Sequence, residues 1–248
     1  MRQSRVYTSQ TLASVDIIGL ERAASHYLAH VLRVSEGDAV TLFNGDGSDY
    51  SGVVCELQRH RVHIRLTHSH VLDNESRLKI TLIQAVTRSE RMDYSLQKAT
   101  ELGVSSIQPL ISSRVEVRLD GKRQANRLTH WRTVVTSACA QCGRAIVPEV
   151  LFPCTLSARL ADAGQTGSEG AGARLVVVPE AGLKLSEYTL SHNAVSVFVG
   201  PEGGFSKEEL QMLGAAAVTS VSLGPRILRT ETAGPVALAL LQAKAGDL

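Results

Sequence analysis

The fold of this 248-residue chain is decided by a stretch that reads Val197-Phe198-Val199-Gly200-Pro201-Glu202-Gly203-Gly204-Phe205. It begins as an apolar, β-branched run, which is typical of a buried parallel strand. Ser206 and Glu209 then form a capping box, so a helix is expected to follow at once and to close at Gly214. A glycine-bearing turn from a parallel strand into a helix is where open α/β folds usually bind ligands.

A second turn of the same kind reads Leu223-Gly224-Pro225-Arg226-Ile227-Leu228-Arg229-Thr230-Glu231-Thr232-Ala233. Strand-to-helix turns often carry glycine for conformation alone, but two of them in one short stretch favour a binding site. Neither continues into Gly-Lys-Ser/Thr, and neither has the dinucleotide-binding spacing, so a P-loop and a dinucleotide site of the usual kind are excluded.

The composition fits a soluble, intracellular protein. Hydrophobic residues make up 44% of the 26.6 kDa chain, enough for a sizeable core. No apolar run reaches the length of a membrane span and no leader opens the chain, so we expect no membrane association and a cytoplasmic location. Cys139 and Cys142 form a Cys-x-x-Cys inside a helical pattern with no second pair, and we interpret them as packed thiols.

The charge is small overall but unevenly distributed. The net charge is +2, and no lysine occurs before Lys79. Ten Lys/Arg stand against five Asp/Glu between Arg88 and Arg144, which favours a nucleic-acid-binding face over an ordinary solvated surface. His26 and His30 lie one helical turn apart, but no further ligand follows at a diagnostic spacing, so no metal site is predicted.

The first part of the chain has mainly β patterns. An edge strand, a glycine-turn hairpin and an alternating strand are expected at 4–8, 39–57 and 61–67. The helix predicted at 21–32 places Ala24, Tyr27 (or Leu28) and Val31 on its apolar stripe. The polar segment 71–77 is interpreted as a linker.

After the linker, strands alternate with helices, which predicts a parallel sheet covered by helices. Strands are expected at 79–87, 104–111, 174–179, 194–199 and 218–223, and helices at 92–102, 122–142 and 233–244. Gly103 should close the first of these helices, and Trp131 should lie in the core. Residues 161–173 are interpreted as an exposed loop without chemistry of its own.

Several motifs together resemble one known family. The two C-terminal turns are similar to those of the small-subunit ribosomal RNA methyltransferase E family, in the SPOUT superfamily. Three further motifs agree, and the likeness runs nearly end to end: His30-Val31-Leu32-Arg33 with Gly37-Asp38, Lys98-Ala99-Thr100-Glu101-Leu102-Gly103-Val104, and Gln141-x-Gly143-Arg144 with Pro148. Ala140 and Cys142 depart from the usual central motif.

The resemblance implies an α/β fold with a C-terminal SPOUT-type trefoil-knot domain at 77–248 and a small PUA-like β-barrel domain at 1–73. It further implies S-adenosylmethionine as cofactor, methylation of uridine N3 in 16S ribosomal RNA of the small subunit, and a homodimer with active sites at the interface. The RNA would be bound in an assembled or assembling 30S subunit. A related enzyme acting on another atom, such as a ribose 2′-hydroxyl, and a non-catalytic RNA-binding assembly factor are the alternatives.

The cofactor is expected to bind by backbone contacts to the two turns and the segment before them. The candidates are Val178, Pro179, Val199, Gly200, Glu202, Gly203, Gly204, Leu223, Gly224, Ile227, Leu228 and Thr230. A side chain at Gly203 in particular is expected to intrude where the backbone meets the cofactor.

The reaction also needs groups that handle a proton and the charge left on the base. Glu202, Glu231 and Glu101 are candidate proton acceptors, and Arg144 and Arg229 are candidate charge stabilisers. The base would have to be unpaired or flipped out. The residues expected to bind RNA are Arg5, Arg33, Arg88, Arg91, Arg114, Gln141 and Arg144.

Overall fold

The computed structural model describes residues 4–58, 61–115, 121–162 and 172–248. The chain divides into two compact units, one formed by Met1–Glu75 with Thr136–Val147 and the other by Ser76–Val135 with Pro148–Leu248. In contrast to the expected boundary between 73 and 77, the end of a helix from the middle of the chain belongs to the first unit. Most of the predicted 161–173 loop lies outside the described residues.

The first unit contains a five-stranded sheet. Its strands are β1 (Ser4–Tyr7), β2 (Ile17–Gly19), β3 (Ala39–Phe43), β4 (Ser48–Gln58) and β5 (Arg61–Val71). They lie in the order β1-β3-β4-β5-β2, and all pairs are antiparallel except β1–β3. The predicted edge strand and hairpin are confirmed. The three-residue β2 was not predicted, because it is too short to show a periodicity.

The helix of this unit differs from its prediction. Helix α1 (Arg22–His26) continues as a π-helix, η1 (Tyr27–Leu32). Ala24 and Leu28 are buried, but Tyr27 and Val31 are 43% and 58% exposed, so the predicted stripe is wrong at Val31. A π-helix bonds from i to i+5, and the wider turn displaces the apolar face from the spacing of an α-helix.

A single arginine connects the start of the first unit with its last segment. The Arg5 side chain lies over the Phe43 ring, 3.9 Å from its centroid, and pairs with Asp49 at 2.7 Å. Its guanidinium also donates to the carbonyls of Cys139, at 2.6 Å, and Arg144, at 2.8 Å. The Arg5 guanidinium therefore binds the last turn of the helix that ends at Cys142 and the residues directly after it, and the Cys139 carbonyl also accepts from Gly143 N at 3.0 Å.

The second unit contains the parallel sheet. Its strands are β6 (Lys79–Ala85), β7 (Ser106–Ile111), β8 (Glu149–Val150), β9 (Cys154–Thr155), β10 (Ala173–Val177), β11 (Ala194–Val199) and β12 (Thr219–Val221). They lie in the order β12-β10-β11-β6-β7-β8, with β9 also paired to β7, and all the pairs are parallel. The strands predicted in this half of the chain are confirmed.

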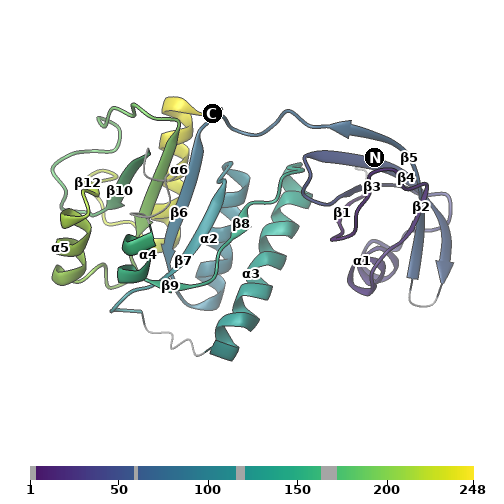
Figure 1. Ribbon diagram of the computed structural model, residues 1–248, viewed down its shortest axis with the longest axis horizontal. Coiled ribbons are helices and arrows are strands. Elements are labelled where there is room, and N and C mark those ends of the chain that lie inside the picture. Colours follow the sequence, from purple (N-terminus) through teal and green to yellow (C-terminus); the bar gives the residue numbers. More distant parts are fainter. Residues whose placement is uncertain (1–3, 59–60, 116–120, 163–171) are drawn as a thin grey trace. The chain divides into compact units, whose positions relative to one another are not determined.

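Helices cover both faces of this sheet (Figure 1). They are α2 (Ser89–Glu101), α3 (Gly121–Cys142), α4 (Leu156–Asp162), α5 (Lys207–Ala215) and α6 (Thr230–Ala245). Leu82 and Ile83, successive residues of β6, are both fully buried. Ile83 packs in a cluster with Leu213 of α5, whereas Leu82 faces Gly234 of α6, so the central strand has no solvent-exposed face.

Most helix predictions hold, with shifts at the ends. Gly103, with φ of +74°, follows α2, and Trp131 is fully buried, both as predicted. The prediction that Gly214 closes α5 is wrong. The helix continues to Ala215, and Ala217 takes the left-handed conformation (φ +56°). Helix α6 begins at Thr230, before the predicted start. No helix among the described residues combines the length and the apolar character that crossing a bilayer requires.

Candidate functional site

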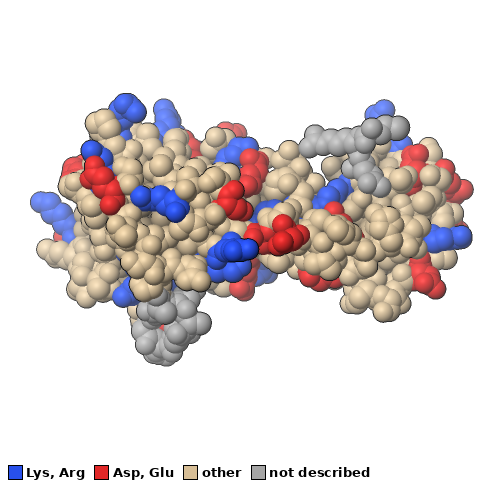
Figure 2. Space-filling model, turned by 90° about the horizontal axis from the view of Figure 1, so that it is seen from above, with Lys and Arg blue, Asp and Glu red and all other residues tan. Residues whose placement is uncertain are grey.

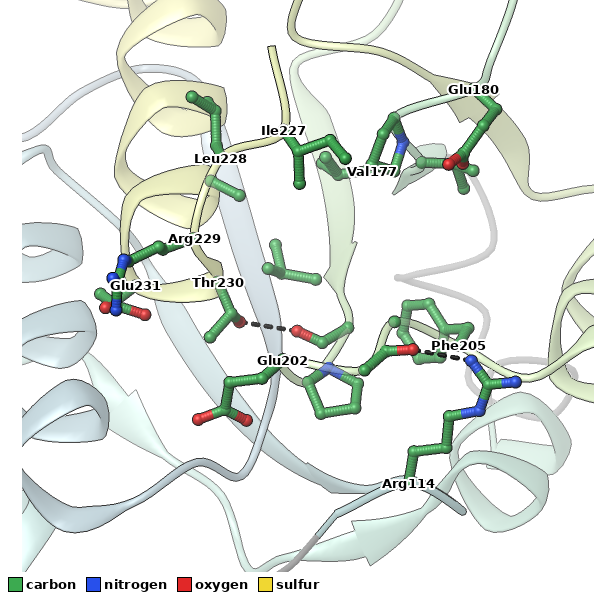
Figure 3. Close-up of a pocket in the computed structure, with 18 of the residues that line it drawn as sticks. Arg114, Val177, Glu180, Glu202, Phe205, Ile227, Leu228, Arg229, Thr230 and Glu231 are labelled. Atoms are coloured by element: carbon green, nitrogen blue, oxygen red, sulfur yellow. Dashed lines mark hydrogen bonds between the residues drawn. The ribbon is translucent and has the colours of Figure 1, made fainter.

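The segments that follow β10, β11 and β12 meet at the carboxyl ends of these strands, and they are called here the first, second and third connections. The first and third are joined by backbone hydrogen bonds from Leu185 N to Ser222 O, at 2.9 Å, and from Ser222 N to Leu183 O, at 2.8 Å. The second and third are joined by the Thr230 hydroxyl, which donates to the Gly200 carbonyl at 2.6 Å (Figure 3). Between them lies a cavity of about 590 Å³.

Ten of the twelve residues predicted to bind a cofactor line this cavity: Val178, Pro179, Val199, Gly200, Glu202, Gly203, Gly204, Ile227, Leu228 and Thr230. The prediction for Leu223 and Gly224 is not matched, because neither residue lines the cavity. Gly224 has φ of +114°, so its glycine is explained by the turn that directs the chain toward the cavity. Sequence reasoning did not name six further wall residues: Pro201, Phe205 and Ala233 within the two turns, and Val177, Glu180 and Leu210 outside them.

The glycines of the first turn have different reasons for being glycine. Gly204 has φ of +67°, and its N–H donates to Pro201 O at 2.9 Å, so this position needs the left-handed backbone. At Gly200 a Cβ would lie 3.2 Å from the Phe205 ring, which is close. At Gly203 a Cβ would lie 3.5 Å from Arg114 Cδ, an ordinary contact, so the structure gives that glycine no steric requirement of its own.

Two carboxylates share one arginine at the cavity. Arg91 of α2 contacts Glu202 at 2.8 Å (Nη1–Oε1) and Glu231 at 3.7 Å (Nε–Oε1). The Glu231 side chain is 16% exposed and that of Glu202 is 34% exposed. Glu231 Oε2 is buried and has no hydrogen-bond partner among the residues that the structure describes. One side of the cavity therefore carries two carboxylates held by one arginine, and one of their oxygens, Glu231 Oε2, makes no hydrogen bond within the described structure.

Arg114, the residue that follows the serines after β7, holds the same turn from the other side. Its Nη1 donates to Gly203 O at 2.7 Å. Arg91 and Arg114, both predicted to bind RNA, thus line the cavity and are bonded to the turn after β11. Arg229, the N-cap residue of α6, also lines the cavity and is exposed.

The predicted capping box connects this turn to β7. Glu209 accepts hydrogen bonds from Ser206 N, at 2.9 Å, and from Ser113 N, at 2.8 Å, while Glu209 N donates to the Ser206 hydroxyl. Burial raises the pKa of the Glu209 carboxyl, but the hydrogen bonds from Ser206, Ser113 and Ser112 outweigh this effect and leave the pKa below its usual value. The ionised Glu209 therefore stabilises the fold and holds Ser113, next to Arg114, against the turn.

Glu209→Gln is expected to lower the free energy of unfolding by about 1 kcal/mol at neutral pH, as loss of a helix cap does. Because the folded-state pKa is depressed, this contribution is present above the unfolded-state pKa of about 4.3 and is lost as the pH falls through the folded-state value. Urea titrations between about pH 3 and 7 should show the wild-type and mutant free energies converging in acid. Glu187→Gln, at an exposed ion pair, is the control. A difference that is constant with pH would contradict the prediction.

Other predicted residues do not line the cavity. Glu101 stands at the far end of α2 from Arg91 and pairs with Lys98 at 2.8 Å. Arg144 has a 6% exposed side chain paired with Glu75 at 2.6 Å, which argues against a charge-stabilising or phosphate-binding role. Arg5 is engaged by Asp49 and two carbonyls, so the structure gives it a structural role instead of contact with RNA.

The remaining RNA candidates are exposed. Arg33 follows η1 with φ of +52°, Arg88 is the N-cap of α2, and Gln141 lies in the last turn of α3. On the face seen in Figure 2, acidic side chains lie among the basic ones. Among the described residues, no group of three or more His, Cys, Asp or Glu side chains is placed to bind a metal ion. The rings of His26 and His30 are in contact, with centroids 4.7 Å apart and planes tilted by 43°.

Comparison with known proteins decides the family. An RNA methyltransferase domain model matches residues 74–242, and an RNA methyltransferase PUA domain model matches residues 20–67. The ribosomal RNA small subunit methyltransferase E of Buchnera aphidicola subsp. Schizaphis graminum is 32% identical over 247 residues, which cover 100% of this chain and 98% of that relative. The chain belongs to the ribosomal RNA small subunit methyltransferase E family.

Solved structures of methyltransferases agree with this family assignment. The methyltransferase E of Neisseria gonorrhoeae, bound to S-adenosyl methionine, is 37% identical with a TM-score of 0.89 and full coverage of both chains. A putative methyltransferase of Legionella pneumophila, in complex with the bound cofactor SAM, is 35% identical with a TM-score of 0.94 and full coverage of both chains. The predicted α/β SPOUT-type fold with an N-terminal PUA-like domain is confirmed. The trefoil knot itself stays a prediction.

Proposed function

We propose that this protein transfers a methyl group from S-adenosylmethionine to N3 of a uridine in 16S ribosomal RNA. The observation that carries the proposal is the cavity at the ends of β10, β11 and β12, with Glu202 and Glu231 on its wall. The RNA methyltransferase family models and the full-length relatives support the reaction class and the ribosomal substrate.

The cavity fits S-adenosylmethionine in size and chemistry. Its volume of about 590 Å³ lies in the range of small-molecule sites. The glycines at 200, 203 and 204 expose backbone groups for polar contacts, while Val178, Leu210 and Ile227 offer apolar surface for a ring or thioether. When bound, this cofactor supplies a methyl group on a sulfonium. The part of the residues around it is to hold both reactants in line, which accounts for much of such a rate enhancement.

The protein's own chemistry concerns the proton of the base. Uridine N3 carries a hydrogen that must be removed before the nitrogen can accept a methyl group, and a nearby carboxylate can take it. Glu231 has an oxygen without a hydrogen-bond partner in the described structure and lies in the first turn of α6. Arg229 and Arg91, both at the cavity, would stabilise negative charge on the base oxygens.

Mapping the modified nucleoside tests the proposal. Small ribosomal subunits, and separately their free 16S RNA, from cells that lack the protein would be incubated with the purified enzyme and S-adenosylmethionine, and the RNA then digested and analysed by mass spectrometry. We expect one new 3-methyluridine. A methyl group on a ribose 2′-oxygen would favour the alternative SPOUT reaction. Absence of both methylation and cofactor binding would favour a non-catalytic assembly factor.

The substrate is proposed to be bound in the cytoplasm, in an assembled or assembling 30S subunit.

Arg33 is exposed and is the candidate for phosphate contact in the first unit. Arg33→Ala is expected to weaken RNA binding and to reduce the slope of log affinity against log salt by about one unit, while cofactor affinity stays unchanged. Lys184→Ala, at an exposed ion pair with Glu187, is the control. An unchanged salt slope in Arg33→Ala would remove Arg33 from the RNA contacts.

A homodimer is proposed from the composition of α6. Its residues Pro235, Val236, Ala239 and Leu240 are only half-buried although all are apolar, and such a helix face is typical of a subunit contact. Light scattering at micromolar concentration should give twice the chain mass of 26.6 kDa. Leu240→Glu should produce monomers and abolish methyl transfer. A fully active wild-type monomer would contradict this proposal.

A further inference from the structure

A fully buried glutamine connects the centre of the parallel sheet to the cavity wall. Gln84 Nε2, on β6, donates to Thr230 Oγ1 at 3.0 Å and to Ala85 O at 3.2 Å. The Thr230 hydroxyl has one hydrogen, and it donates that hydrogen to Gly200 O at 2.6 Å. Its lone pair must therefore accept from Gln84. These contacts form a directed chain from β6, through the first residue of α6, to the turn after β11.

The surroundings of Gln84 show that a glutamine at this position lowers the stability of the fold. On the next turn of α6, Gly234 leaves space for it, since a Cβ there would lie 3.2 Å from Gln84 Oε1. That oxygen is buried and has no hydrogen-bond partner among the described residues. A buried polar atom without a partner costs free energy, whereas an apolar side chain of the same size would not. Stability alone does not explain a glutamine on this central strand.

We propose that Gln84 is a positioning residue for the cofactor cavity. The Gln84 amide N–H donates to the Thr230 hydroxyl oxygen. The hydroxyl hydrogen therefore points at the Gly200 carbonyl. This fixes the peptide plane at the start of the 200–204 turn, whose backbone lines the cavity. Gln84 is not among the residues that line the cavity and acts only through Thr230. The inference rests on the proposed function, because it takes the occupant of the cavity to be S-adenosylmethionine.

Gln84→Glu tests the direction of the chain of hydrogen bonds. When protonated, the carboxyl can still donate to Thr230. When ionised, it can only accept, so it draws the hydroxyl hydrogen away from Gly200. Full burial raises the pKa of such a carboxyl to as much as about 8–9. Calorimetric titration with S-adenosylmethionine from about pH 6 to 10 should give mutant affinity within about twofold of wild type at the low end and about tenfold weaker at the high end.

The comparison is made as a ratio of mutant to wild type at each pH. Glu202, Glu231 and Arg91 line the same cavity in both proteins, so a change of this ratio with pH reports the substitution at position 84. A ratio that does not change with pH, in a variant that circular dichroism shows to be folded, would overturn the proposal.

Gln84→Met separates positioning from a merely structural role. Methionine has a similar size but no polar atom to leave unpaired, so the melting temperature should stay the same or rise. Cofactor affinity should nonetheless fall about threefold, because the Thr230 hydroxyl becomes free to rotate. A variant with wild-type affinity, or one that loses stability and affinity together, would contradict the proposal. If the wild-type protein itself binds no S-adenosylmethionine, that result contradicts the proposed function, whereas the effects of the Gln84 variants test only the positioning role.

Discussion

Glu231→Gln is expected to lower the rate of methyl transfer at saturating RNA and cofactor by about a hundredfold or more, the usual effect of removing a proton acceptor. The amide keeps the size of the side chain but cannot take the N3 proton. Glu231 Oε2 has no hydrogen-bond partner in the described structure, so this substitution removes a reactive group without breaking a short contact. Single-turnover methylation with quenched samples measures the rate, and calorimetry measures cofactor affinity, which should change little.

Glu202→Gln is the matched control. Glu202 lies on the same cavity but is more exposed and is bonded to Arg91 at 2.8 Å. Its substitution should lower the single-turnover rate less than tenfold, since its carboxylate is already neutralised. If Glu202→Gln proved the slower enzyme, Glu202 would be the proton acceptor. If both variants kept the wild-type rate, neither carboxylate would accept the proton.

Gly204→Val is expected to weaken S-adenosylmethionine binding about a hundredfold. A β-branched residue at φ of +67° is strained by about 1–3 kcal/mol. The turn relieves that strain by leaving the left-handed region, and the backbone of 203–204 then no longer faces the cavity as it does now. Calorimetric titration measures the loss, and each tenfold change corresponds to about 1.4 kcal/mol.

Gly214→Ala serves as the control for a glycine replacement. Gly214 lies within α5, does not have positive φ, and a Cβ there would meet nothing within 4 Å. Alanine should stabilise this helix by up to about 1 kcal/mol and leave cofactor affinity unchanged. A folded Gly204→Val protein that binds the cofactor as the wild type does would show that the positive φ is not needed for the site.

Local patterns predicted much of the second unit. The strands β6, β7, β10, β11 and β12 and the capping box of α5 depend on residues within a few positions of each other, which the sequence displays directly, whereas the two-residue strands β8 and β9 were not predicted. The two glycine turns were recognised for the same reason, and most of the cavity wall follows from them. The backbone angle at each glycine could not be read from the sequence, so the positive φ of Gly204 was not predicted, and the expectation that a side chain at Gly203 intrudes on the cofactor stays a prediction.

The sequence predictions fail mainly for side chains whose partners lie far away in the sequence. Arg5 and Arg144 look like free basic groups in sequence, but their partners Asp49 and Glu75 lie 44 and 69 positions away. Long-range ion pairs have no sequence signature, so a count of arginines overstates the charge available to RNA. The π-helix at Tyr27–Leu32 was missed because its apolar residues fit an α-helical spacing equally well.

The hydrogen bonds from Arg5 to the carbonyls of Cys139 and Arg144 have a consequence for folding during synthesis of the chain. Arg5 leaves the ribosome early, and its two acceptors follow 134 and 139 residues later. At about 5–20 residues per second, the two carbonyls are synthesised roughly 7 to 28 s after Arg5. The N-terminal unit is therefore begun first but completed only after most of α3 has been translated. A nascent chain arrested at residue 75 contains all five strands of this sheet and still lacks the carbonyls that close it.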